Sequence, residues 1–362
     1  MLSPTRIRIE ASSVCQLRCA ACPTASGANA RLLGRGYLAF ANFQKLVDDN
    51  PEIGLIELSN YGEPFLNPEM LAILEYAHRK GVQLSFGNGA NLNTVSPAVL
   101  EGVVKYGLRR LTCSIDGVTQ ETYAKYRIRG NLATALENVR TIDAHKKRYG
   151  AHYPVLTWQF IVFSHNRHEL EAARRMAGEL GMHFVPKLSW NEDGDTAAPS
   201  PQETAPHSRS AYRARYGVDY MRTICHQLWT MPQINWDGAV LGCCRNYWGD
   251  FGGNALSGDL LSALNSERIV YAREMLRGKR PPRADIPCST CALYRSMAQN
   301  GLWLTRSETF MPGHIVKRLF ESGVRAPAAF AALAIPFRLL EIATRFGNRF
   351  RRRLRATGWR LV

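Results

Sequence analysis

The chain has 362 residues, of which 46% are hydrophobic and 21% charged, enough for a normal core in one large domain plus a smaller one. The N-terminus has no apolar stretch typical of a signal peptide, and the longest nearly apolar run, 326–337, is short of the roughly 20 residues of a membrane span. We therefore expect a cytoplasmic protein. The net charge is +16, and its largest concentration is a basic tail, where residues 313–362 hold eleven Lys or Arg and two Glu.

Strands alternate with helical segments through the first half of the chain. Repeated strand–helix units of this kind predict a parallel sheet with right-handed crossovers. Six strands are too few for a closed eight-stranded barrel, so we expect an α/β fold that forms an open, partial (β/α)6 TIM-like barrel. Asn67 is expected to cap the first long helix, with Pro68 at its first position. The predicted strands are 6–12, 53–59, 82–86, 110–116, 155–162 and 183–187, and glycines expected to end helices are Gly81, Gly107, Gly150 and Gly181.

The predicted domain order is a barrel, a linker, a cysteine-rich domain and a tail. Residues 1–190 form the barrel, and 191–219 form a linker because 190–215 is polar and rich in Pro, Ser and Thr. Residues 220–300 form a small auxiliary domain, and residues 301–362 form a basic helical tail. Nine cysteines in a reducing compartment are not expected to form disulfides, and their two clusters suggest metal or metal–sulfur ligation in two places.

The first cluster is Cys15, Cys19 and Cys22, directly after the first strand. Three thiolates can hold three irons of a 4Fe–4S cubane and leave the fourth iron open for another ligand. Structural cysteines or a partial zinc site are the alternatives. Zinc prefers four ligands, and no fourth Cys or His is near in sequence.

This spacing resembles the signature of the radical S-adenosylmethionine (SAM) superfamily, in which the open iron chelates the methionine part of SAM. Segments that follow the next strands also resemble family motifs: Asn60–Pro64, Asn88–Gly89, Ser114–Gly117 and Tyr123–Arg127. The sequence departs from the family pattern at Ala21, where a large residue is usual, and at Tyr61, where glycine is usual. The resemblance implies SAM contacts at Tyr61, Gly62, Glu63, Asn88, Ser114, Asp116 and Arg127.

Side chains alternate along a strand, which separates two faces of residues 110–116. Leu111, Cys113 and Ile115 share one face, so Cys113 is expected to be a buried small hydrophobic residue and not a ligand. Ser114 and Asp116 share the face expected to line the barrel. Arg127 suits the SAM carboxylate but could equally pair with Glu121. Other polar residues on faces that could point inward are Glu10, Glu57, Ser59, Thr157 and Gln159.

The second cysteine cluster resembles the auxiliary-cluster domain called SPASM. Cys225 is followed by Gly238, then by Cys243 and Cys244 five and six residues after that glycine, and later by Cys288-x2-Cys291. The distal cysteines of a full SPASM domain are absent, as in the shorter "twitch" domain. Cys225, Cys243, Cys288 and Cys291 suffice for one further 4Fe–4S cluster. Cys244 is a spare thiol or exchanges with Cys243, and a four-cysteine zinc ribbon is the competing interpretation.

The resemblance implies an enzyme that cleaves SAM reductively to a 5′-deoxyadenosyl radical and abstracts a substrate hydrogen, with electrons from a reductant such as flavodoxin or ferredoxin. We expect oxidation of a small molecule such as a sugar or cyclitol. A maturase that modifies a peptide or protein side chain is the alternative, and it is less favoured because the first strand begins near Arg6, without a preceding peptide-binding domain. We do not expect a nucleic acid partner.

The tail has the pattern of a basic amphipathic helix. Such a helix can bind the surface of an anionic membrane, which would place the protein at the inner face of the membrane. A helix docked on the protein's own surface is the alternative. One predicted stripe is Leu339, Ala343, Phe346, Phe350 and Leu354, and the other is Arg338, Arg345, Arg349 and Arg352.

Overall fold

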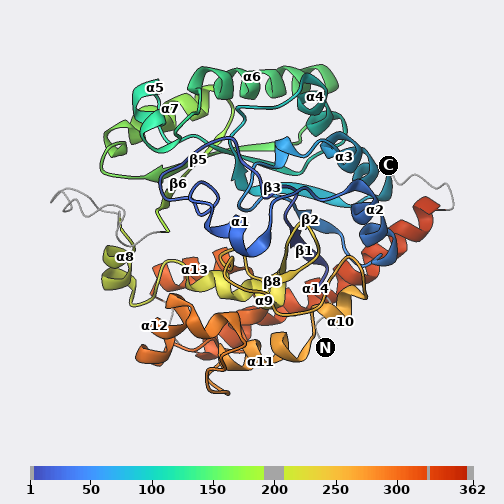
Figure 1. The fold of residues 1–362 in the computed structure, drawn as a ribbon, viewed down its shortest axis with the longest axis vertical. Helices are drawn as coiled ribbons and strands as arrows, with labels where there is room; N and C mark the ends of the chain where they lie inside the picture. Colours follow the sequence, from blue (N-terminus) through green and yellow to red (C-terminus); the bar gives the residue numbers. More distant parts are fainter. Residues whose placement is uncertain (1–3, 191–207, 324–326, 357–362) are drawn as a thin grey trace. The chain divides into compact units, whose positions relative to one another are not determined.

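The computed structural model describes residues 4–190, 208–323 and 327–356. The chain forms two compact units, each assembled from separate segments (Figure 1). The first unit contains Met1–Ile9, Lys45–Ile56 and Tyr212–Val362, and the second contains Glu10–Gln44 and Glu57–Ala211. The chain therefore passes between the units several times, whereas the domains predicted from the sequence are continuous.

The second unit is built on four parallel strands. Hydrogen bonds join β3 (Gln83–Ala90), β4 (Arg110–Ser114), β5 (Val155–Val162) and β6 (His183–Leu188) in the order β6-β5-β4-β3. Ser114 lies opposite Gln159 in the β4–β5 register. Trp158, Phe86 and Phe160 are completely buried, as expected for strands covered on both sides. The predicted α/β class with a parallel sheet is confirmed.

Helices follow the strands of this unit, as the hydrophobic periodicity predicts. Gly81, Gly107, Gly150 and Gly181 all have positive φ angles of 59–70°, so each predicted helix end is confirmed. The helices are α1 (Ala28–Leu33), η1 (Pro64–Leu66), α3 (Met70–Lys80), α4 (Pro97–Lys105), α5 (Gln120–Tyr126), α6 (Leu132–Tyr149), η2 (Arg167–Glu169) and α7 (Leu170–Glu179).

The predicted role of Asn67 as the helix cap is wrong. Helix α3 begins at Met70, and its N-cap is Glu69. The Asn67 side chain instead joins three backbone segments: its amide donates to the carbonyls of Ala11 and Leu38 at 2.8 and 2.9 Å, and its oxygen accepts from the Glu69 N–H at 2.8 Å. A buried asparagine that satisfies distant backbone groups cannot be distinguished from a cap in sequence, because both precede a helix.

The first unit has a short sheet and mostly short helices. Strand β7 (Gln233–Ile234) pairs parallel with β1 (Arg6–Ile9) and antiparallel with β8 (Val240–Gly242). α2 (Phe40–Asp49), β2 (Leu55–Glu57) and α8 (Arg209–Tyr216) lie where the chain passes between units. The remaining helices are η3 (Arg222–His226), α9 (Gln227–Thr230), α10 (Leu260–Ala263), α11 (Glu267–Met275), η4 (Pro287–Thr290), α12 (Ala292–Asn300), η5 (Glu308–Phe310), α13 (Gly313–Glu321) and α14 (Pro327–Ala356).

Part of the predicted linker 191–219 is helical. Residues 209–216 form α8, and the Arg209 guanidinium donates to the Trp190 carbonyl at 2.9 Å. Residues 191–207, which contain most of the predicted linker, lie outside the described residues.

Candidate functional site

Cys15, Cys19 and Cys22 lie on the loop after β1, within the second unit. Cys19 is buried, while Cys15 and Cys22 are half-buried. Burial, together with the nearby Glu63 carboxylate, Cys19 and Cys22, raises the pKa of the Cys15 thiol to about 12. The three thiols thus lie within electrostatic reach of one another.

Asn91 and Gln16 hold Cys15, and the sequence did not single out either residue. The Asn91 amide donates to the Cys15 sulfur at 3.7 Å, and the Gln16 amide donates to the Asn91 side-chain oxygen at 2.9 Å. Asn91 follows the predicted Asn88–Gly89 turn by two residues. The only signal in the sequence for a role of Asn91 was that this polar residue lies so close to a predicted site.

The turn at Tyr61 and Gly62 is fixed by a buried carboxylate. Glu10 accepts hydrogen bonds from the Tyr61 N–H at 3.1 Å and from the Gly62 N–H at 3.0 Å. A Cβ atom added at Gly62 would lie 1.9 Å from the Ser12 carbonyl oxygen, so only glycine fits. The Thr24 hydroxyl donates to the Tyr61 carbonyl at 2.8 Å and ties the turn to the cysteine loop. The sequence suggested that the Glu10 side chain could point inward, and in the structure this side chain stabilises the Tyr61–Gly62 turn.

Glu63 is a buried carboxylate beside Cys15. Its oxygens accept from the Asn91 N–H at 2.7 Å and from the Phe65 N–H at 3.4 Å. Burial raises the pKa of Glu63 to about 7, although these hydrogen bonds and the Arg127 charge act in the opposite direction. A carboxylate whose charge is this poorly compensated favours a cationic ligand.

The raised pKa of Glu63 predicts a pH dependence of stability in the metal-free protein. A native pKa of about 7 above the ordinary 4.5 means that the contribution of Glu63 is fully present below about pH 4.5 and is lost as the pH rises to 7. Relative to Glu63→Gln, the wild type should lose roughly 2–3 kcal/mol of unfolding free energy between pH 5 and 8. Urea titrations of both proteins would measure this. Parallel pH curves would contradict it.

Asn88 and Ser114 lie on either side of Gly89. The Asn88 N–H donates to the Ser59 hydroxyl at 2.9 Å, and its amide donates to the Asn60 side-chain oxygen at 2.9 Å. Gly89 has a φ of 124°, and a Cβ atom there would lie 2.3 Å from the Ser114 hydroxyl oxygen. Ser59 is oriented by the buried Glu57, which accepts from its hydroxyl at 2.5 Å. The structure thus brings the predicted residues at the ends of β3 and β4 together.

Asp116 and Arg127 form an ion pair of 2.6 Å, and both side chains are largely buried. The Arg127 guanidinium also donates to the Cys19 sulfur at 3.7 Å. Asp116 accepts from the Ile161 N–H at 2.6 Å, so strand β5 fixes the pair. Glu121, the alternative partner of Arg127, pairs with Lys125 instead. Asp116 therefore orients an arginine that reaches the cysteine loop. Cys113 is fully buried.

Four of the five cysteines in the first unit line one pocket. Cys225 lies in η3, Cys243 follows β8, Cys288 lies in η4 and Cys291 precedes α12. Burial raises the pKa values of Cys225 and Cys288 well above their usual range, and the other pocket thiols raise them further. Within the described residues, no three His, Cys, Asp or Glu side chains form a preformed site for a single metal ion. The pocket is otherwise largely apolar, lined by residues that include Leu228, Leu241, Phe251, Leu276 and Trp248.

Cys244 is outside this pocket. Its N–H donates to the Gln227 side-chain oxygen at 2.7 Å, and the Gln227 amide donates to its sulfur at 3.4 Å. Cys244 is buried, so Gln227 holds it in place. Of the adjacent pair, the structure therefore directs Cys243 alone to the other three thiols.

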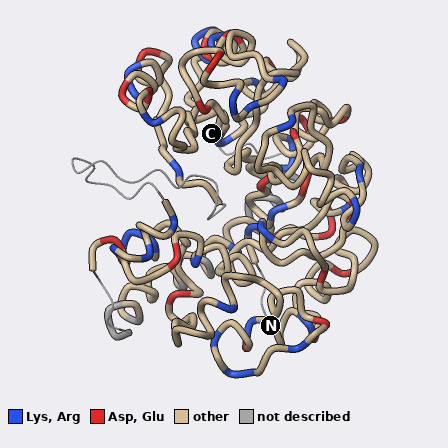
Figure 2. Tube along the Cα trace, turned by 60° about the vertical axis from the view of Figure 1, so that its left-hand side comes forward, with Lys and Arg blue, Asp and Glu red and all other residues tan. Residues whose placement is uncertain are grey.

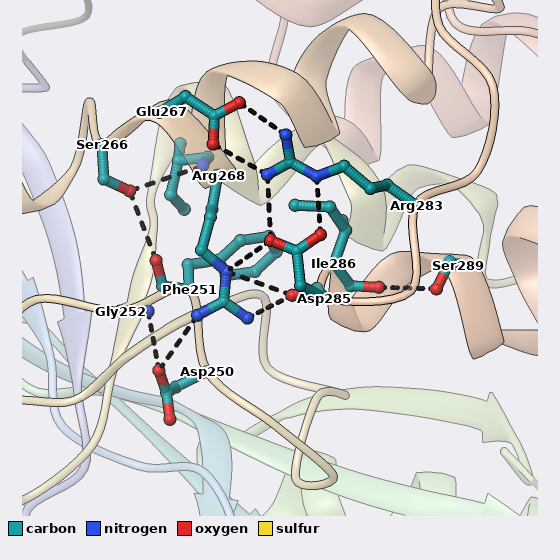
Figure 3. A network of polar contacts seen from close by, with 11 residues as sticks. Asp250, Phe251, Gly252, Ser266, Glu267, Arg268, Arg283, Asp285, Ile286 and Ser289 are labelled. Carbon is teal, nitrogen blue, oxygen red and sulfur yellow. Dashed lines mark hydrogen bonds and ion pairs between the residues drawn. The ribbon is translucent and has the colours of Figure 1, made fainter.

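An arginine–carboxylate network anchors the segment that leads to Cys288 (Figure 3). The Arg283 guanidinium binds both oxygens of Glu267 on α11, at 2.6 and 2.7 Å, and also pairs with Asp285. Arg268 of α11 donates to the Asp285 carbonyl at 3.1 Å. The Trp248 indole donates to the Pro287 carbonyl at 2.9 Å. These contacts join the loop after Cys243 and helix α11 to the loop that carries Cys288.

The donor chemistry of both sites fits iron–sulfur clusters. The three-thiol site offers one ligand fewer than a cubane has irons, and the four-thiol site offers a full set. A parallel α/β unit that contains a three-thiol loop next to a glycine turn and a buried glutamate fits an iron–sulfur enzyme in which one iron stays accessible.

Two curated relatives agree with this class. The chain is 26% identical over 211 residues to the AdoMet-dependent heme synthase of Methanosarcina barkeri, a match that covers 57% of this chain and 57% of that protein. It is 21% identical over 258 residues to the tungsten-containing aldehyde ferredoxin oxidoreductase cofactor-modifying protein of Pyrococcus furiosus, covering 66% and 70%. No protein-family model matches the chain.

Solved structures show the same fold. Streptococcus suis SuiB bound to S-adenosylmethionine aligns with a TM-score of 0.59 at 12% identity, over 81% of this chain and 71% of that chain. SuiB bound to its precursor peptide SuiA aligns with a TM-score of 0.56 at 12% identity, over 82% and 71%. Together, these similarities support a radical SAM superfamily enzyme that uses SAM and a 4Fe–4S cluster.

Proposed function

We propose that the chain oxidises a small molecule by two electrons, using SAM at the three-thiol site and a second 4Fe–4S cluster at the four-thiol site. The observation that carries this proposal is the four-thiol pocket. It is separate in sequence from the first site, is lined mostly by cysteine and apolar residues, and has enough thiols to ligate every iron of a cubane. We also propose the domain boundaries predicted above for the barrel, auxiliary domain and tail.

At the first site, Cys15, Cys19 and Cys22 would hold the cluster. When bound there, the cluster and SAM would supply the chemistry of radical formation and hydrogen-atom abstraction from substrate. The buried Glu63 carboxylate would accept hydrogen bonds from the SAM ammonium group. The positive charge of the ammonium would compensate the negative charge of this buried carboxylate. Arg127, oriented by Asp116 beside Cys19, would bind the SAM carboxylate.

The turns on neighbouring strands would position the rest of SAM. The Tyr61–Gly62 turn, fixed by Glu10, allows close approach of a ligand to the backbone. Asn88 and Ser114 place polar groups at the ends of β3 and β4, where ligands of parallel α/β folds bind. Gln159, opposite Ser114 on β5, would extend this polar surface toward substrate.

At the second site, Cys225, Cys243, Cys288 and Cys291 would ligate all four irons. Because no iron is then open to substrate, the role left for this site is electron transfer. Arg222 and Arg245 act electrostatically on Cys225, and their positive charge favours an added electron. The largely apolar lining would limit the access of water to the cluster.

A small molecule is the substrate class that the relatives favour. Their names describe a heme synthase and a cofactor-modifying protein, which act on small molecules. SuiB bound to a precursor peptide represents the alternative, a peptide maturase. A sugar or cyclitol alcohol fits the oxidation proposed here. A flavodoxin or ferredoxin would supply the first electron.

Electron stoichiometry tests the proposal. Loss of a hydrogen atom leaves a substrate radical, and loss of a proton and one electron from that radical completes a ketone. The reconstituted enzyme, incubated with SAM, a reductant and the small-molecule fraction of a cell extract, should form a product about two mass units lighter. Each product should match one 5′-deoxyadenosine. A product isomeric with its substrate, SAM recovered after many turnovers, or stimulation by the peptide fraction alone would contradict the proposal.

A further inference from the structure

One side of α14 docks on its own unit. Phe330 and Ala334 are each 2% exposed, and the Phe330 and Phe320 rings pack with centroids 5.5 Å apart. The Asn348 amide is buried and donates to the Glu52 carbonyl at 3.0 Å. Phe330 and Asn348 are eighteen residues apart, about five helical turns, so they lie on the same side of the helix.

The opposite side of α14 is apolar and exposed. Leu339 is nine residues from both Phe330 and Asn348, about two and a half turns, so it points away from the docked side. Ile335, Leu339, Ile342 and Phe346 follow the spacing i, i+4, i+7, i+11 and are 53–68% exposed. Of the thirteen large hydrophobic residues exposed in the described part of the chain, six lie on this helix. Exposed apolar residues concentrated in this way indicate a binding surface.

The positive charge of α14 indicates which kind of partner its exposed side binds. Elsewhere along the described trace, basic and acidic residues are interspersed (Figure 2). The sequence 338–355 instead holds seven arginines and one glutamate. A second copy of the chain on this surface would bring two such segments together, and like charges would repel. Anionic lipid headgroups have the opposite charge and attract basic residues by about 1 kcal/mol each.

We propose that the surface formed by Ile335, Leu339, Leu340, Ile342 and Phe346 binds an anionic lipid membrane. The apolar side chains would enter the headgroup boundary while α14 lies in the membrane plane, held to its own unit by the opposite side. In the described residues no helix is long and apolar enough to cross a membrane. The tail stripes predicted from sequence are thus partly described: Leu339, Ala343 and Phe346 are exposed, whereas the side chains of Phe350, Leu354, Arg338, Arg349 and Arg352 lie outside the described residues.

Vesicle flotation of the reconstituted full chain tests this. We expect binding to phosphatidylcholine vesicles that contain about 30% phosphatidylglycerol, and at least tenfold weaker binding of the double variant Leu339→Asp/Phe346→Asp. The control is Val270→Asp, which adds a charge at a residue that is 42% exposed on α11 and should leave binding unchanged. Iron content and 5′-deoxyadenosine formation should be the same in all three proteins, which shows that they fold.

Three outcomes would overturn the membrane proposal. The first is equal vesicle binding by the double variant. The second is binding to pure phosphatidylcholine as strong as to the anionic vesicles, which would remove the role of charge. The third is self-association that the double variant loses, with no vesicle binding by the wild type, which would identify a second copy of the chain as the partner.

Discussion

Replacing Cys15, Cys19 and Cys22 together with alanine should abolish 5′-deoxyadenosine formation and halve the iron content. In the proposed mechanism these three thiols hold the cluster that leaves one iron open, and SAM cleavage needs that cluster. Two cubanes hold about eight irons and the variant should hold about four, because the four-thiol pocket belongs to the other compact unit. Anaerobic reconstitution, iron analysis and chromatography of the reaction products would measure both quantities.

Cys113→Ala is the matched control for this experiment. Cys113 is fully buried on β4 and lies outside the thiol loop, so the variant should keep about eight irons and its SAM cleavage. Its expected cost is about 1 kcal/mol of stability from the small cavity. Continued SAM cleavage by the triple variant would contradict the assignment of the first site.

Cys243→Ala and Cys244→Ala should behave differently although the residues are neighbours. Cys243 lines the pocket with three other thiols, whereas Cys244 is held by Gln227. Cys243→Ala should therefore lower the iron content from about eight to about four, and Cys244→Ala should leave it at about eight. Both variants should retain SAM cleavage in the absence of substrate, because the first site is separate.

The same pair of variants distinguishes the competing interpretations of the second site. Equal retention of iron by both variants would show that the two thiols can replace each other as ligands. One equivalent of zinc with about four irons in the wild type would identify a zinc ribbon. The zinc result would remove the proposed electron acceptor, whereas ligand exchange would keep it, and both results would leave the proposed first site intact.

The strands were the most predictable part of the fold. Each strand contains an apolar run that is long enough to identify it in the sequence. The predicted strand 155–162 matches β5 at both ends, and the predicted strand 183–187 matches β6 within one residue. Glycines at helix ends were equally readable, because their positive φ is a local requirement. The assembly of one unit from residues near both ends of the chain was not predictable, since hydrophobic periodicity carries no information about distant pairing.

The site was predictable where residue spacing determines chemistry, and less so where distant contacts do. The cysteine spacing pointed to both thiol sites, and strand alternation correctly separated Cys113 from them. The roles of Glu10 at the Tyr61 turn and Asn91 at Cys15 depend on contacts across 51 and 76 positions, which no local pattern encodes. The same holds for Asn67, whose carbonyl partners lie 29 and 56 positions away.

The pairing of β1 with β7 has a consequence for synthesis on the ribosome. Residues 1–9 emerge first, but their strand partner in the same unit, 233–234, is translated more than two hundred residues later. At about 5–20 residues per second, the first strand waits roughly 10–40 s for that partner. During this interval the second unit, which ends at Ala211, is already complete. The order of synthesis therefore gives the unit that carries the three-thiol loop time to fold first, and a fragment cut at residue 190 would leave β1 without its β7 partner.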